Sequence, residues 1–386
     1  MLQKVTLHNI LSFKELTVEL RNLNVLVGPN ASGKSNFIEV LGLLQAAPRD
    51  LPGAIQKGGG IAEWKWKGKP DGELLLQVTV PHGLRFLAYK LELHANPSGP
   101  PFSSESLTTQ TPFPGHSSPY IYFDKDKDLA TVNTFVGEQR PKRSLKREDT
   151  DAHQSLLAQI KDPVQYPEIA QVAKLFDRIR LYRDWNMGRS AQPRQPQPAD
   201  MPNDFLREDA ANLGLVLNRM ERDGSLAKVE KYLSRFLRDY KRLSIQVQLG
   251  TGQLFLGERD LASLIPATRL SDGTLRFLGL MAVLCHAELP PLICIEEPEL
   301  GLHPDAVRIA AEALREAAQK TQVVITTHSD ALVDELSDEP ESIIVCERNA
   351  DGSSRFRRLV QSQLEVWLDE YRLGELWRRG ELGGTL

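Results

Sequence analysis

The sequence predicts an α/β fold with a mainly parallel core sheet, a flanking antiparallel β layer and a helical lobe. One observation is that the strand-like segment 23–28 runs through a glycine-rich loop into helical periodicity from Asn36. A second is that two later apolar segments, ending near Glu296 and His328, are separated by a helix predicted from Asp305. Strands that alternate with helices in this way are typical of parallel sheets.

The composition is that of an ordinary globular protein, with 41% hydrophobic and 25% charged residues among 386. The net charge of −4 means that a nucleic-acid surface would have to be a local patch. Three cysteines without CxxC spacing predict reduced core thiols rather than a metal site. Because no secretory signal or simple membrane span is visible, we expect a cytoplasmic protein without a membrane partner.

The clearest motif is GPNASGKS at residues 28–35, a complete GxxxxGK[ST] between a predicted strand and a predicted helix. Backbone N–H groups of such a loop surround phosphates, the lysine reaches their oxygens, and the serine hydroxyl binds Mg²⁺. We therefore expect this segment to bind a nucleotide, with Lys34 in a catalytic role and Ser35 on the metal. The expected binding residues are Gly28, Pro29, Asn30, Ala31, Ser32, Gly33, Lys34, Ser35 and Asn36.

Glu296 and Glu297 stand side by side at the end of the apolar segment ICIEE. Neighbouring ionised carboxylates repel each other and resist burial, so a cation is expected nearby. In a P-loop protein, an apolar strand ending in a carboxylate supplies a second Mg²⁺ contact. We expect Glu296 to hold the metal and Glu297 to orient and deprotonate water, with Mg²⁺ and Lys34 offsetting the repulsion. The alternative is a solvated strand end.

Two further segments carry a family resemblance. RLSDGTLRF places Ser271 at a helix N-cap with Gly273 behind it, and VVITTHS places His328 just past an apolar strand. With these motifs the chain resembles the ABC-class ATPases, and the SMC/RecF/OLD-like group more closely than the transporters. Residues 270–274 stand at the LSGGQ signature, and LGLH at the D-loop. The opening LHNILSFKELTVELRNLNVLVGPNASGKSN looks like the amino-terminal signature of the RecF/SMC group.

The match has departures and weaker extensions. Asp272 replaces the first signature glycine, Thr274 the glutamine, and Glu296 the usual aspartate. LYRDWN and LREDAANLGLVLNRM look like segments of stand-alone bacterial proteins of the AAA ATPase family. Gln56 lies about where a Q-loop residue could be, and an ordinary loop glutamine is the alternative.

The resemblance implies an ABC-type ATPase that uses ATP and Mg²⁺. Two copies would pair head to tail as a homodimer and sandwich the nucleotides. Ser271 and Gly273 would contact the γ-phosphate on the partner's P-loop, and His328 would be the catalytic switch histidine. A plain helix cap for Ser271 and a strand-end histidine for His328 are the alternatives.

We expect a single ABC-type ATPase unit over residues 1–386. Residues 1–149 would carry the P-loop and an antiparallel layer at about 61–125, with an exposed Pro-, Ser- and Thr-rich loop at 96–115. Residues 150–285 would form the helical signature lobe, interrupted by an extended Pro-rich surface loop at 188–202. Residues 286–386 would complete the ATPase lobe with the Glu-Glu strand, the D-loop and the switch histidine.

Two segments are candidates for DNA contact. The first is a basic stripe of five residues at 3-4-3-4 spacing, which are expected to line one face of the amphipathic helix predicted around residues 229–243 and to contact phosphates. The second is the mixed-charge loop RPKRSLKRED at 140–149. A solvated helix face is the alternative for the stripe. Its members are Lys228, Lys231, Arg235, Arg238 and Arg242.

The leading functional expectation is an ATP-switched dimer in a DNA transaction, of the repair or anti-phage defence type. The segment after His328 is too short for the TOPRIM nuclease domain of OLD-family proteins, so a nuclease or effector would be a separate subunit. The alternative is a nucleotide-switched regulatory or scaffold protein that does not bind DNA. A transporter ATPase is a third reading, which the signature and the amino-terminal motif disfavour.

Overall fold

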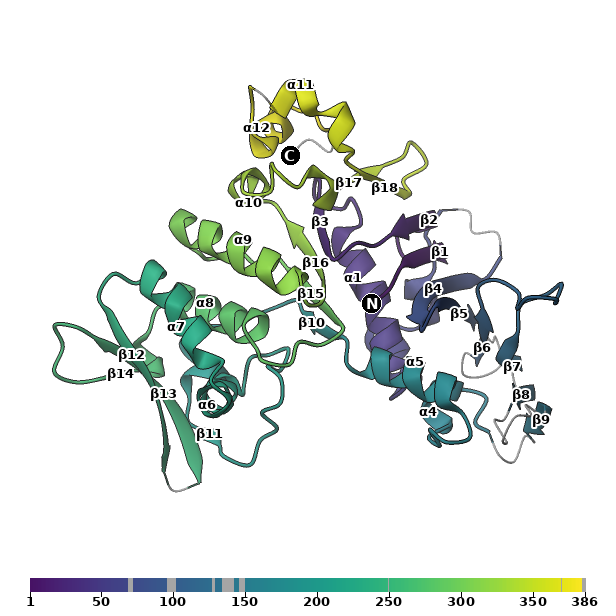
Figure 1. Cartoon of the computed structure of the whole chain (residues 1–386), viewed down its shortest axis with the longest axis horizontal. Helices are drawn as coiled ribbons and strands as arrows, with labels where there is room; N and C mark the ends of the chain where they lie inside the picture. Colours follow the sequence, from purple (N-terminus) through teal and green to yellow (C-terminus); the bar gives the residue numbers. More distant parts are fainter. Residues whose placement is uncertain are drawn as a thin grey trace.

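The computed structural model contains three sheets in the residues that it describes, with helices packed around the central one (Figure 1). Within these residues, no helix is both long enough and apolar enough to cross a membrane. The described residues are those of 1–386 outside 69–71, 96–101, 127–128, 134–141, 146–149, 249, 369 and 384–386.

The core sheet has six strands, of which the first five in spatial order run parallel and the last runs antiparallel to its neighbour. The predicted, mainly parallel core sheet is therefore confirmed. Its P-loop strand is separated from the Glu-Glu strand only by the strand that ends at the histidine. In spatial order the strands are β10 (Arg180–Tyr182), β15 (Leu292–Glu296), β16 (Gln322–Thr327), β3 (Leu23–Val27), β17 (Ile343–Arg348) and β18 (Ser354–Arg358).

Helices cover both faces of this sheet because its strands are apolar on both sides. On β3, Val25 and Val27 join the core that contains α8 (Asp272–Leu284) and α9 (Pro304–Ala318). Leu26 points the other way, into the core that contains α1 (Lys34–Ala46). The P-loop helix and the signature helix therefore lie on opposite faces of the core sheet.

An eight-stranded antiparallel sheet flanks the core, as predicted. The helices α2 (Leu51–Lys57), α3 (Ile61–Trp64), α4 (Leu156–Gln159) and α5 (Pro167–Asp177) contribute buried residues to the apolar core on this side. In spatial order its strands are β2 (Phe13–Glu19), β1 (Lys4–Ile10), β4 (Leu74–His82), β5 (Arg85–His94), β6 (Phe102–Thr109), β7 (Ile121–Asp126), β8 (Leu129–Asn133) and β9 (Lys142–Leu145).

The prediction of a loop at 96–115 is wrong in part, because residues 102–109 form strand β6. Residues 96–101 lie outside the described residues. The inward positions of β6 include Ser103 and Glu105, so the strand has no apolar alternation to detect. Glu105 is fully buried and accepts hydrogen bonds from Tyr89 and Ser155. These bonds let a polar strand occupy the middle of a sheet.

Residues 150–285 contain the predicted helices together with a small sheet. The helices here are α6 (Leu213–Asp223), α7 (Leu226–Phe236) and α8, together with α4 and α5, which pack in the core on the side of the antiparallel sheet. Strand β10 of the core sheet also falls in this part. The helix predicted over 229–243 ends at Phe236, because the chain turns extended at Leu237 and pairs as β12 from Tyr240. The small sheet consists of β11 (Gln197–Pro198), β13 (Thr251–Glu258), β12 (Tyr240–Gln248) and β14 (Ile265–Pro266).

Near the end of the chain, a short helix packs against the helix that follows β16. Helices α10 (Asp330–Asp334) and α12 (Leu373–Arg378) are in close contact, and α11 (Glu365–Leu368) precedes α12. The backbone N–H of Gly374 donates to Asp334, and a Cβ on Gly374 would lie 2.2 Å from the Asp330 carbonyl oxygen. This close approach requires glycine.

Candidate nucleotide site

The P-loop joins β3 to α1 and is held tightly against neighbouring strands. Gly28 has φ 149°, and a Cβ there would lie 2.1 Å from the carbonyl oxygen of Cys346 in β17. Gly33 has φ 101°, and its Cβ would lie 2.3 Å from Oγ of Ser354 in β18. Only glycine fits either position, so the motif's glycines set the path of the loop.

Lys34 folds back over this loop. Its Nζ donates to the carbonyl oxygens of Gly28, at 2.8 Å, and Pro29, at 2.9 Å. Burial lowers the pKa of Lys34, while the nearby Glu297 and Glu296 oppose that change. The buried Ser32 hydroxyl has no hydrogen-bond partner in the described part of the chain. A loop with a central ammonium group and an unused hydroxyl fits an anionic ligand.

Glu296 ends β15 and meets the first turn of α1. Burial raises the pKa of Glu296 and Glu297 adds to this effect, whereas a hydrogen bond with Ser35 and the charge of Arg183 oppose it. The Arg183 Nε lies 4.0 Å from the Glu296 Oε1. Arg183 follows β10, which pairs with β15, and it is a cation that the sequence analysis did not identify.

The Ser35–Glu296 pair fits a hard cation, because both side chains offer oxygen ligands. Within the described residues, no group of three or more His, Cys, Asp or Glu side chains could hold a metal by itself. The remaining ligands would have to be phosphate oxygens and water, as is usual for Mg²⁺.

Glu297 and His328 face each other at the ends of β15 and β16. Glu297 Oε1 lies 4.0 Å from His328 Nε2, and both side chains are partly exposed. Burial and the charge of Lys34 lower the pKa of His328, although Glu297 opposes the shift, so the neutral imidazole is favoured. Glu297 has φ 45°, a strained conformation for a residue with a Cβ, and such strain is common at functional sites.

Glu299, which the sequence analysis did not single out, ties these two segments together. Its Oε1 accepts hydrogen bonds from the Thr327 hydroxyl, at 2.6 Å, and from the His328 N–H, at 3.0 Å. Burial raises the pKa of Glu299. Its buried Oε2 has no partner among the described residues. The only hint of Glu299 in the sequence is that a second glutamate follows Glu297 two residues later, just after an apolar strand.

The signature segment forms the N-terminus of α8. The Ser271 hydroxyl accepts from the Thr274 N–H at 3.0 Å, as a helix cap does. A Cβ on Gly273 would lie 2.9 Å from the carbonyl oxygen of Gly301 in the D-loop. Ser271 and Gly301 are exposed, and α8 lies on the opposite face of the core sheet from α1. One surface therefore presents the signature and the D-loop together, away from the chain's own P-loop helix.

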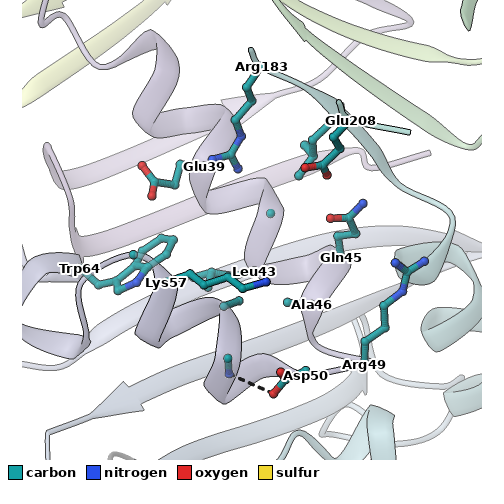
Figure 2. Close-up of a pocket in the computed structure, with 15 residues that line it drawn as sticks. Glu39, Leu43, Gln45, Ala46, Arg49, Asp50, Lys57, Trp64, Arg183 and Glu208 are labelled. Atoms are coloured by element: carbon teal, nitrogen blue, oxygen red, sulfur yellow. Dashed lines mark hydrogen bonds between the residues drawn. The ribbon is translucent and has the colours of Figure 1, made fainter. Parts of the chain in front are cut away.

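A cavity of about 210 Å³ adjoins the Glu-Glu pair and is lined by Arg183 and Arg276 among others. Another, of about 410 Å³, runs along α1 and α2, where charged side chains of both signs line it (Figure 2). Gln56, the Q-loop candidate, is exposed on α2 and lines neither cavity. Arg183 lines both.

The basic stripe differs from its prediction. Lys228 and Arg235 form ion pairs with α9, at 2.9 Å to Glu316 and 2.7 Å to Glu312. Arg238 follows the end of α7, and Arg242 lies in β12, so the five residues do not share one helix face. In the other candidate, 140–149, residues 142–145 form strand β9 and the rest lies outside the described residues.

Comparison with protein families identifies the chain. The model described as "AAA domain, putative AbiEii toxin, Type IV TA system" matches residues 23–74 and 95–334. The chain belongs to this family. Comparison with curated proteins gives no match.

Solved structures agree with this assignment at the level of the fold. An SMC head bound to the C-winged helix domain of ScpA gives a TM-score of 0.58 at 14% identity, covering 95% of this chain and 99% of that one. An SMC head with an extended coiled coil, derived from Pyrococcus furiosus, gives a TM-score of 0.55 at 12% identity. This match covers 96% of this chain and 98% of that one. The fold is thus that of an ABC-type P-loop ATPase of the SMC/RecF type, as the sequence predicts.

Proposed function

We propose that this ABC-type protein binds ATP with Mg²⁺ at its P-loop and hydrolyses it as a head-to-tail homodimer. The observation that carries the proposal is the meeting of five predicted side chains at one edge of the core sheet. Lys34 and Ser35 come from α1, the two glutamates from the end of β15, and the histidine from the end of β16.

Each side chain has a role that suits its surroundings. Lys34 would exchange its two carbonyl partners for phosphate oxygens, and Ser35 with Glu296 would hold the metal. Bound Mg²⁺ would neutralise charge on the phosphates during transfer. Glu297 would take a proton from water, and the N–H of the neutral His328 beside it would donate a hydrogen bond to the γ-phosphate.

The dimer is proposed from the placement of the signature segment. Because α8 and α1 lie on opposite faces of the sheet, Ser271 and Gly273 would act on the P-loop of a second copy. The exposed Leu300, 54% accessible, lies beside them in the D-loop and would be covered in such a pair. A two-fold arrangement would use the same surface on both copies and close the assembly.

The task that hydrolysis drives is proposed to be a DNA transaction of the repair or defence kind in the cytoplasm, which could include gating a separate effector or nuclease. The wording of the family description, which mentions a toxin of a type IV TA system, is compatible with the defence context. The alternative remains a nucleotide-switched scaffold that does not bind DNA. Lys231, Arg238 and Arg242 are exposed and form the part of the stripe to test for DNA contact.

The testing experiment uses Glu297→Gln, which should bind ATP and hydrolyse it poorly. Its mass in solution is measured with and without ATP, and then with linear duplex DNA. An ATP-dependent dimer that retains DNA supports the whole proposal. A dimer indifferent to DNA supports the scaffold alternative, and the absence of an ATP-dependent dimer would contradict the head-to-tail mechanism.

A further inference from the structure

Arg194 is a buried arginine in the Pro-rich segment, and it contacts the signature segment. Its side chain is 3% exposed, although the segment was expected to lie on the surface. The Nε group donates to the carbonyl oxygens of Met187, at 2.8 Å, and Gly188, at 3.0 Å. The guanidinium is therefore anchored at the base of its own loop.

The other two guanidinium nitrogens reach the residues that lead into α8. Nη1 donates to the carbonyl oxygens of Ala267, at 3.2 Å, and Leu270, at 2.6 Å. Nη2 forms an ion pair with the carboxylate of Asp272, the first residue of α8. Because guanidinium donors form a rigid planar fork, these bonds fix both the position and the direction of the chain on either side of Ser271.

Asp272 itself needs such a partner. It occupies the position where the resemblance expects the first signature glycine, and its side chain is 63% exposed. A free carboxylate beside Ser271 would face the γ-phosphate of a nucleotide brought by a second copy, and like charges repel. The buried guanidinium supplies the opposite charge and holds this carboxylate in a fixed place.

We propose that Arg194 is the positioning residue for the signature segment, and that Arg194 and Asp272 form one unit that lets an aspartate replace the signature glycine. The inference rests on the proposed function, since it concerns the contact of Ser271 with the partner's nucleotide. Arg194 does not touch the nucleotide; it acts through Ser271 and the N-terminus of α8.

The experiment compares Arg194→Met, Arg194→Lys and the double variant Arg194→Met/Asp272→Gly with Arg189→Met. Arg189 is an exposed arginine of the same segment and serves as the matched control. Four quantities are measured for each variant. They are the binding of a fluorescent ATP analogue to dilute protein, the protein concentration at half-maximal ATP-dependent dimer in the Glu297→Gln background, turnover, and the melting temperature.

For Arg194→Met we expect unchanged analogue binding, since the P-loop is intact. Misplacing Ser271 should raise the protein concentration for dimerisation, and lower turnover, by roughly tenfold or more. Arg194→Lys should fall between Arg194→Met and the wild type, because it keeps the charge beside Asp272 but fewer of the carbonyl contacts. The double variant should recover part of the loss, because the unpaired carboxylate is gone.

Three results would overturn the inference: an Arg194→Met variant that behaves like Arg189→Met, one that loses analogue binding together with its thermal stability, or a double variant no better than Arg194→Met. The second result would show that Arg194 only stabilises the fold and does not position the signature segment. A Glu297→Gln protein that keeps Arg194 and stays monomeric with ATP would instead contradict the proposed function, so the two failures are distinguishable.

Discussion

The backbone N–H of His328 donates a 3.0 Å hydrogen bond to the carboxylate of Glu299, three residues beyond the end of the neighbouring strand. The same oxygen accepts from the Thr327 hydroxyl. One carboxylate thus joins the loop after β15, which carries Glu297, to the loop after β16, which carries the histidine. When either loop moves, this link must break or the other loop must move with it, so Glu299 couples the positions of Glu297 and His328.

The first prediction concerns this link. Glu299→Ala should lower the free energy of unfolding by about 1–3 kcal/mol, since it leaves a buried N–H and a hydroxyl without an acceptor. Turnover should also fall, because His328 is no longer held. Glu299→Gln keeps the accepting oxygen and is the matched control. Chemical denaturation and steady-state kinetics measure both effects; equal loss in the two variants would show that the acceptor is not what matters.

The second prediction concerns pH. Burial raises the pKa of Glu299 above that of an unfolded glutamate. The folded state therefore binds the proton more tightly, and this residue's contribution to stability is fully present below the unfolded pKa and lost as pH rises through the folded pKa. Relative to Glu299→Gln, the wild type should lose stability as pH rises above about 4.3. Unfolding midpoints across pH for both proteins test this, and parallel curves would contradict it.

The third prediction separates stability from activity at Glu297. Its φ of 45° is strained for glutamate and tolerated by asparagine. Glu297→Asn should raise the free energy of unfolding by about 1 kcal/mol. It should also abolish most turnover, since removing a general base typically costs 10²–10⁴-fold. Calorimetry and phosphate release measure the two changes. A destabilised Glu297→Asn would show that the backbone strain is compensated locally.

Most of the candidate site was predictable because its signals are local in sequence. The P-loop glycines require positive φ or close backbone approach, and an apolar strand ending in glutamates is visible without tertiary information. Arg183 and Arg194 were not predictable in the same way. Each acts on residues far along the chain, on Glu296 and on the α8 N-terminus, and neither lies in a spacing pattern of its own.

Strand β6 and the basic stripe are two places where the structure differs from the pattern in the sequence. Glu105 is buried in a polar network, so its strand lacked apolar alternation. Lys228 and Arg235 form ion pairs with α9, so two of the five positive charges at this spacing have partners within the chain. Buried polar networks and long-range ion pairs leave no periodic signal, because their partners are distant in sequence.

The fourth prediction follows from those ion pairs. Arg235→Glu would place a carboxylate beside Glu312 and should lower the free energy of unfolding by about 0.5–1 kcal/mol, in the range of exposed pairs. Its effect on DNA retention would therefore mix folding with binding. Charge reversal at Lys231 and Arg238, both exposed, should leave the melting temperature nearly unchanged. Thermal melts of the three variants test this. An Arg235→Glu variant with an unchanged melting temperature would contradict the structural role of the pair.

The last prediction concerns Arg183, the arginine beside Glu296. Burial raises the pKa of Glu296 and Glu297 adds to the rise, whereas the charge of Arg183 opposes it. Arg183→Met should therefore raise the pKa of Glu296 further, so that a larger fraction of this carboxyl is protonated at acidic pH. Because the proposed metal contact needs the ionised form, the acidic limb of kcat/KM should move to higher pH, and added Mg²⁺ should partly restore activity. Arg276→Met is the control, since Arg276 lines the same cavity but comes from α8. An acidic limb that does not move, or that moves equally in both variants, would show that Arg183 does not act through Glu296.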